Sequence, residues 1–203
     1  MPSSESSKRK LPFFRIITAT CIGICIGYFI FYSQIEKIQI NNSEVKGIIC
    51  LVIDDYGFVF NDMIKDFLQL DPSLTAAIIP GSPYAEKIGQ YTDSLNIESI
   101  IHMPMESYEK EKWKYEIDLN EKLNADLVEK RVRRAFKEVP TALGMNNHRG
   151  SKATESLQLM KDLARTLKKM DKFFLDSFTN PESRGYITMR RFGVPTQLRQ
   201  VFL

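Results

Sequence analysis

Cysteine and histidine are scarce in this chain, whose 203 residues include three cysteines and two histidines. Cys21 and Cys25 lie in an apolar segment, and Cys50 lies in an expected strand. An odd number of cysteines with these placements provides no disulfide framework. Cys50 is most simply a small buried hydrophobic residue.

Phosphate-binding loops, internal repeats and a general excess of basic residues are also missing. No Gly-x-Gly-x-x-Gly or Walker-type sequence follows any expected strand, so nothing indicates a nucleotide cofactor. The formal net charge is +3, but residues 1–33 hold four basic side chains and one acidic one, which leaves the rest of the chain neutral. The sequence therefore gives no indication of a nucleic-acid surface.

The amino-terminal residues have the composition of a membrane anchor. The basic cluster Lys8-Arg9-Lys10 precedes an uncharged, mostly apolar run at residues 16–32, and residues 11–14 extend it to the ~20 residues that a membrane helix needs. Basic residues before the run orient its start toward the cytoplasm. No Ala-x-Ala cleavage pattern follows. We therefore expect a cytoplasmic tail at 1–10, a signal anchor at 11–33, a linker at 34–46 and an extracytoplasmic domain at 47–203.

Strand-like and helix-like segments alternate from Gly47 onward. The expected strands are 48–53, 74–79, 98–101, 142–145 and 173–175, and the expected helices are 61–70, 83–95, 124–139, 154–170 and 181–192. Such alternation indicates parallel strands joined by right-handed helical crossovers. The pattern predicts an α/β domain and leaves open whether its sheet closes as a barrel or stays doubly wound.

Acidic and imidazole side chains follow three of the apolar runs. Asp54-Asp55 comes after the first, His102 after the third and His148 after the fourth. The carboxyl ends of parallel strands meet at one edge of a sheet, and carboxylate with imidazole is the ligand set of a catalytic divalent metal. Consecutive aspartates point apart on a regular strand, so we expect a bend that lets one bind metal while the other contacts water. These residues predict a metal-dependent hydrolase of acyl or amide bonds.

Four short segments resemble, in order, the motifs of the divergent polysaccharide deacetylase family, a branch of the NodB-like carbohydrate esterases. The segments are IDDYG at 53–57, HMPME at 102–106, NNHRGS at 146–151 and FFLDS at 173–177. The resemblance implies an irregular (β/α) barrel and removal of acetyl groups from an envelope polysaccharide. It also implies that the domain continues past residues 201–203, an apolar run that we expect to form a strand. We therefore expect an incomplete barrel.

Carried over by position, the resemblance assigns Asp54 as general base, Asp55 as metal ligand and His102 as a second ligand. The third ligand departs from the pattern of standard deacetylases, which place a second histidine four residues after the first. Glu106 stands at that position here. His148 is therefore the preferred third ligand, with Glu106 as a neighbour of the site or an alternative ligand.

The resemblance also implies roles for residues around these ligands. Asn147, Ser151 and Asp176 would line the site, and Asp176 would orient a histidine or act as the acid–base partner. The expected cofactor is a divalent metal ion, in the first instance zinc, and the expected partner is an acetylated glycan. Two alternatives remain open: a non-catalytic module that binds glycan or protein on the same scaffold, and a glycoside hydrolase that pairs Asp54 with Asp176.

Overall fold

The computed structural model describes residues 47–71, 73–109 and 117–203. Within the chain, Cys50–Leu203 forms one compact unit. The expected tail, anchor and linker at 1–10, 11–33 and 34–46 lie outside the described residues. Among the described helices, none combines the length and the apolar character that crossing a membrane requires.

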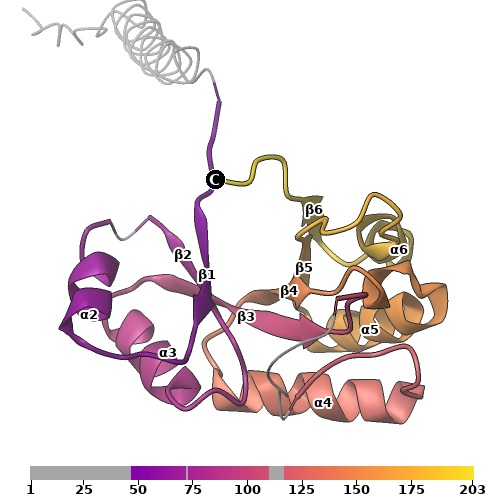
Figure 1. Cartoon of the computed structure of the whole chain (residues 1–203), viewed down its shortest axis with the longest axis horizontal. Coiled ribbons are helices and arrows are strands. Elements are labelled where there is room, and N and C mark those ends of the chain that lie inside the picture. The colour runs from indigo at the N-terminus through magenta and orange to yellow at the C-terminus, as the bar shows by residue number, and fades with distance from the viewer. Residues whose placement is uncertain (1–46, 72, 110–116) are drawn as a thin grey trace, which may run out of the picture. The chain divides into compact units, whose positions relative to one another are not determined.

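One sheet of six parallel strands organises the described part of the chain. The strands are β1 (Val52–Tyr56), β2 (Thr75–Ile78), β3 (Glu98–Met105), β4 (Gly144–Arg149), β5 (Phe173–Asp176) and β6 (Thr196–Leu198). Each strand pairs in parallel with the next strand along the chain (Figure 1). A doubly wound sheet reverses its strand order at a switch point, whereas this sheet keeps one direction, as a (β/α) barrel does. Among the described residues β1 and β6 do not pair, so the sheet is open between them.

Helices connect successive strands. They are α2 (Asp62–Leu68), α3 (Ala85–Ser94), α4 (Ala125–Glu138), α5 (Leu157–Met170) and α6 (Gly185–Phe192), with the short 3-10 helix η1 (Ala153–Glu155) before α5. The side chains of Asn61, Asn124 and Ser156 cap three of them by accepting a hydrogen bond from the backbone N–H three residues on. α5 packs against both α4 and α6 (Figure 1). The predicted alternation of strands and helices is confirmed.

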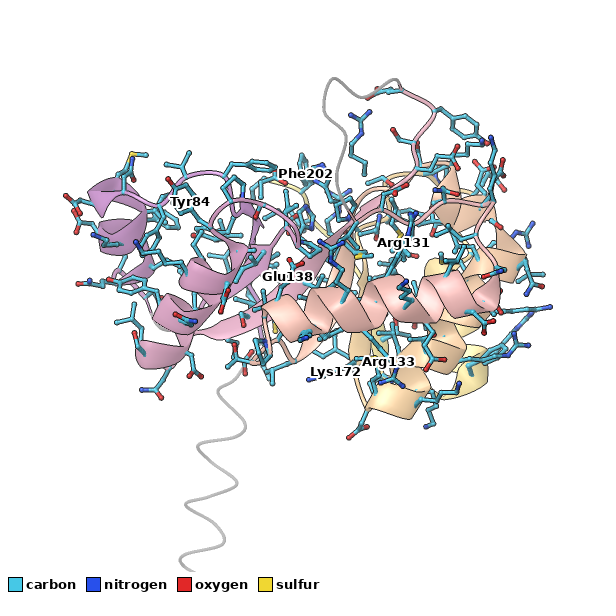
Figure 2. The ribbon with its side chains drawn as sticks, turned by 90° about the horizontal axis from the view of Figure 1, so that it is seen from below. Tyr84, Arg131, Arg133, Glu138, Lys172 and Phe202 are labelled. Carbon is cyan, nitrogen blue, oxygen red and sulfur yellow. The ribbon has the colours of Figure 1, made fainter. Side chains whose placement is uncertain are left out.

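The hydrophobic core lies between the helices and one face of the sheet. Its members include Ala76, Ile78, Ile101, Met103, Met145 and Phe174 from strands and Ile88, Val132, Leu163 and Met189 from helices. α4 carries charged residues outside this core, among them Arg131, Arg133 and Glu138 (Figure 2). Burying each large apolar side chain contributes about 1.5–3 kcal/mol, so the core fixes which face of each strand turns toward the helices.

Three strands run further toward their carboxyl ends than the apolar runs predict. β1 includes Asp54 and Asp55, β3 includes His102, and β4 includes residues 146–148. The predicted strand at 201–203 is wrong, because these residues belong to no strand and the last strand is β6. The expected site residues therefore lie within strands, where the alternation of side chains decides the face to which each one points.

Candidate functional site

A bulge in β1 brings Asp54 and Asp55 to the same face of the sheet. Ile53 and Tyr56 are three residues apart but pair with residues of β2 that are two apart, so β1 holds one extra residue between them. The backbone of Asp55 is left-handed, with a φ of 67°. That conformation destabilises a non-glycine residue by about 1–2 kcal/mol. Ile53 and Tyr56 pack with the core, while both aspartates meet polar side chains of β3 and β4.

β3 and β4 add two imidazoles and an amide to that face. In the register of these strands, His102 lies beside Asn146. His148 follows Asn146 by two residues, so its side chain points the same way. The alternate positions Met103 and Met145 belong to the core on the other face. The polar groups of three strands therefore converge on the side of the sheet that the core leaves free.

Asp55, His102 and His148 bring three ligand atoms together. Oδ1 of Asp55 lies 3.1 Å from Nε2 of His102 and 3.0 Å from Nδ1 of His148, and these two nitrogens are 3.1 Å apart. The imidazole planes meet at 75°. Hydrogen bonds from His102 and then His148 hold the pKa of the Asp55 carboxyl well below its usual range, because they favour its charged form.

This set of donor atoms suits a divalent metal ion. Asp55, His102 and His148 are a group of metal-ligating residues whose ligand atoms lie within 4.8 Å of one another. Separations of 3.0–3.1 Å allow one ion to contact all three atoms at the ~2.0–2.2 Å typical of zinc bound to imidazole and carboxylate. Three protein ligands leave a position for water or substrate, as catalytic zinc sites do. The side chain of Asp55 is 67% exposed, so solvent reaches the group.

Asn146 joins this group to Asp54. Its Oδ1 lies 2.7 Å from Nδ1 of His102, and its Nδ2 donates to Oδ1 of Asp54 at 2.8 Å. Asn146 is 2% exposed. The resemblance implied Asn147 instead, and residues 146–148 were expected to follow the strand. Once β4 is known to continue through them, the two-residue spacing from His148 identifies Asn146.

Asp176 lies on the opposite face of the sheet from the histidines. Phe174 pairs beside Met145, and both belong to the core. Asp176 follows Phe174 by two residues in β5, so its side chain points toward the helices rather than toward the candidate metal group. The expectation that Asp176 orients a histidine or acts as the acid–base partner does not match this placement.

The carboxylate of Asp176 anchors the loop that leads into α6. It is fully buried and accepts hydrogen bonds from the backbone N–H groups of Phe178 and Tyr186 and from the hydroxyl of Ser183. Among the described residues, these three groups are the hydrogen-bond donors to the Asp176 carboxylate. Because Asp54 and Asp176 lie on opposite faces, they do not form the carboxylate pair of a glycoside hydrolase.

Asn147 and Ser151, both expected to line the site, hold neighbouring loops instead. Oδ1 of Asn147 accepts from the backbone N–H of Ser177 at 2.8 Å, and its Nδ2 donates to the carbonyl of Arg149 at 2.6 Å. The Ser151 hydroxyl accepts from the backbone N–H of Tyr108 at 3.2 Å. These contacts link the ends of β3, β4 and β5 and support the site from outside.

Glu106 is engaged in an ion pair. The ammonium of Lys152 lies 2.9 Å from Oε1 of Glu106 and 2.8 Å from Oε1 of Glu121. Burial works to raise the pKa of Glu106, but Lys152 and the backbone N–H of Glu121 outweigh it and hold that pKa below its usual range. Among the described residues it is therefore His148, and not Glu106, that lies with Asp55 and His102 in the candidate metal group.

The fold is similar to that of a solved bacterial protein. The crystal structure of the uncharacterized protein ATU2773 from Agrobacterium tumefaciens C58 aligns with a TM-score of 0.70 and 17% sequence identity, over 76% of this chain and 63% of that one. At this identity the similarity establishes the fold alone.

Two curated relatives are themselves uncharacterized. The uncharacterized protein YibQ of Escherichia coli K12 is 29% identical over 166 residues, which cover 82% of this chain and 51% of that protein. An uncharacterized protein of Haemophilus influenzae is 36% identical over 155 residues, which cover 76% of this chain and 55% of that protein. This chain spans about half the length of the curated relatives it matches.

A family model matches the region that contains all six strands and the site. The family is described as divergent polysaccharide deacetylase, and the match covers residues 51–203. It includes the four segments in which the resemblance was found, and the order of β1 to β6 agrees with the implied type of barrel. This chain belongs to the divergent polysaccharide deacetylase family.

Proposed function

We propose that this chain is a divalent-metal-dependent hydrolase that removes acetyl groups from an envelope polysaccharide. The observation that carries the proposal is the convergence of Asp55, His102 and His148 on one point, with Asp54 beside them. The family description supports a carbohydrate substrate. Two imidazoles and one carboxylate suit zinc, which we propose as the ion.

The residues of the site would have two different roles, metal binding and proton transfer. Asp55, His102 and His148 would hold the ion, which when bound polarises a carbonyl group and activates water. Asp54 would act as the general base: Asn146 holds its Oδ1, while its Oδ2 has no partner among the described residues. The Asp54 side chain is 34% exposed, which lets a water molecule reach it. A carboxylate in hydrogen-bond reach of that water takes its proton as the acyl bond is attacked.

Acetate release tests the proposal directly. The full-length chain, loaded with zinc, should release acetate from acetylated chitooligosaccharides or peptidoglycan fragments. A chelator such as dipicolinate should reduce the rate to background, and added zinc should restore it, because the ion is part of the site. Stoichiometric zinc without acetate release from any acetylated glycan or simple acetyl ester would contradict the enzyme and favour the non-catalytic glycan-binding module. Acetate release that the chelator does not change would contradict metal dependence.

We also propose that residues 11–33 anchor the chain in a membrane, with the domain outside the cytoplasm. The support is the uncharged run at 16–32 after the basic cluster at 8–10. The full-length chain should stay in the membrane pellet after alkaline carbonate extraction, and protease added to spheroplasts should degrade it. Recovery in the carbonate supernatant would contradict the anchor, and full protection from the protease would contradict the orientation.

A further inference from the structure

Asn146 bridges the two functional parts of the candidate site, the ligand His102 and the carboxylate of Asp54. Its amide contacts Nδ1 of His102 at 2.7 Å and Oδ1 of Asp54 at 2.8 Å, whereas these two residues approach each other directly only to 3.6 Å. We infer that Asn146 is the positioning residue of the site: it fixes the tautomer of His102 and orients Asp54. This inference extends the proposed function, on which its catalytic meaning rests.

The chemistry of donors and acceptors determines the orientation of the Asn146 amide. A carboxylate only accepts hydrogen bonds, so the atom of Asn146 that faces Asp54 must be the amide NH₂. The carbonyl oxygen of the same amide then faces His102. A carbonyl oxygen also only accepts, so Nδ1 of His102 must carry a hydrogen and donate it. The reverse orientation of the amide would place oxygen against oxygen at Asp54 and leave the imidazole without its acceptor.

The tautomer decides which nitrogen of His102 is available to a metal. Because Nδ1 donates to Asn146, Nε2 is the nitrogen that the ring can offer to a metal. A proton that Nε2 donates to Asp55 in the absence of an ion leaves when the ion binds. Nε2 is the atom that lies 3.1 Å from Oδ1 of Asp55 and 3.1 Å from Nδ1 of His148. Asn146 therefore prepares the ring for ligation before any ion arrives, as the outer partners of metal-bound histidines do.

Burial makes this arrangement hard to replace with water. His102 is 4% exposed and Asn146 is 2% exposed. A buried donor that loses its acceptor is strongly unfavourable, so the bond between them is maintained in the folded chain. The amide also leaves only Oδ2 of Asp54 without a protein partner among the described residues, which directs that oxygen toward solvent.

Nitrogen NMR of the metal-free, full-length chain tests the inference without any measurement of activity. The chain has two histidines, so a His148→Gln variant assigns their signals by difference. Long-range ¹H–¹⁵N spectra distinguish the two neutral tautomers of an imidazole ring. His102 is expected to carry hydrogen on Nδ1, in the neutral ring or in the imidazolium. A wild-type His102 that lacks hydrogen on Nδ1 would overturn the inference, whether or not any variant folds.

Two substitutions at position 146 separate the two roles. Asn146→Leu removes both hydrogen bonds, so His102 should lose its single tautomer and the dissociation constant for zinc should rise about 10–100-fold. Asn146→Asp keeps an acceptor for His102 but places a second carboxylate against Asp54, so the tautomer should persist while acetate release falls. A His102 tautomer unchanged in Asn146→Leu would overturn the inference.

Asn147→Leu is the matched control. Asn147 is a neighbouring asparagine of β4 that is 1% exposed and also makes two hydrogen bonds, but it points to the other face. The variant should keep the tautomer of His102 and the wild-type affinity for zinc. An equal change in Asn147→Leu would show a general structural effect and overturn a specific role for Asn146. The correct tautomer without zinc binding would instead contradict only the proposed function.

Discussion

Replacing His148 by alanine is expected to raise the dissociation constant for zinc by more than about 100-fold. The substitution removes one of the three proposed ligands and leaves Asp55 and His102, whose candidate ligand atoms are 3.1 Å apart. Loss of a direct ligand exceeds the 10–100-fold effect typical of the groups that support ligands. Competition with a chromophoric chelator measures the affinity in the full-length chain, and circular dichroism confirms that the variant is folded.

Glu106→Gln is the control for that experiment. Glu106 occupies the position where standard deacetylases have their second histidine, but its carboxylate is paired with Lys152. Exposed and half-exposed ion pairs contribute about 0–1 kcal/mol, so the variant should fold and should bind zinc within about threefold of the wild type. The opposite pattern, with zinc lost in Glu106→Gln and kept in His148→Ala, would make Glu106 the third ligand.

The layered arrangement of this chain was accessible from its sequence because strands and helices differ in length and in the period of their apolar residues. Each expected helix between 61 and 192 has a counterpart in α2 to α6, and each of the first five expected strands has one in β1 to β5. The alternation alone left open the choice between a barrel and a doubly wound sheet, because that choice depends on strand order, and local patterns carry no information about which strands pair. Only the resemblance of the four segments implied a barrel.

The site was harder to predict because its residues break the local rules of strands. The second half of β4 is polar because Asn146 and His148 face the candidate site and Asn147 bonds the loop after β5. The apolar run therefore ended at Met145, before the strand does. That error hid the alternation that separates Asn146 from Asn147. The consecutive aspartates predicted a bend in the backbone but not its form, because an aspartate in a left-handed conformation is uncommon and only the paired strand reveals the extra residue.

Substituting Asp54 by asparagine is expected to lower the turnover number for acetate release by about 10²–10⁴-fold while zinc binding stays close to wild type. An asparagine keeps the shape of the side chain and an oxygen that accepts from Asn146, but it cannot take a proton from water. Asp54 is not in the ligand group, so the affinity for zinc should change little. Steady-state acetate release and zinc titration are measured on the same sample. Full activity of the variant would exclude Asp54 as the base.

Asp176→Asn makes the same chemical change on the other face of the sheet and should give the opposite result. Asp176 accepts from two backbone N–H groups and one hydroxyl, and an asparagine turns its NH₂ toward at least one of these buried donors. The free energy of unfolding, measured with urea, should fall by about 1–3 kcal/mol. Turnover by the folded variant should remain near wild type, because no atom of Asp176 faces the ligand group. A large loss of turnover with unchanged stability would contradict this placement and show that Asp176 takes part in the reaction. The loop before α6 would then have to reorganise when substrate binds.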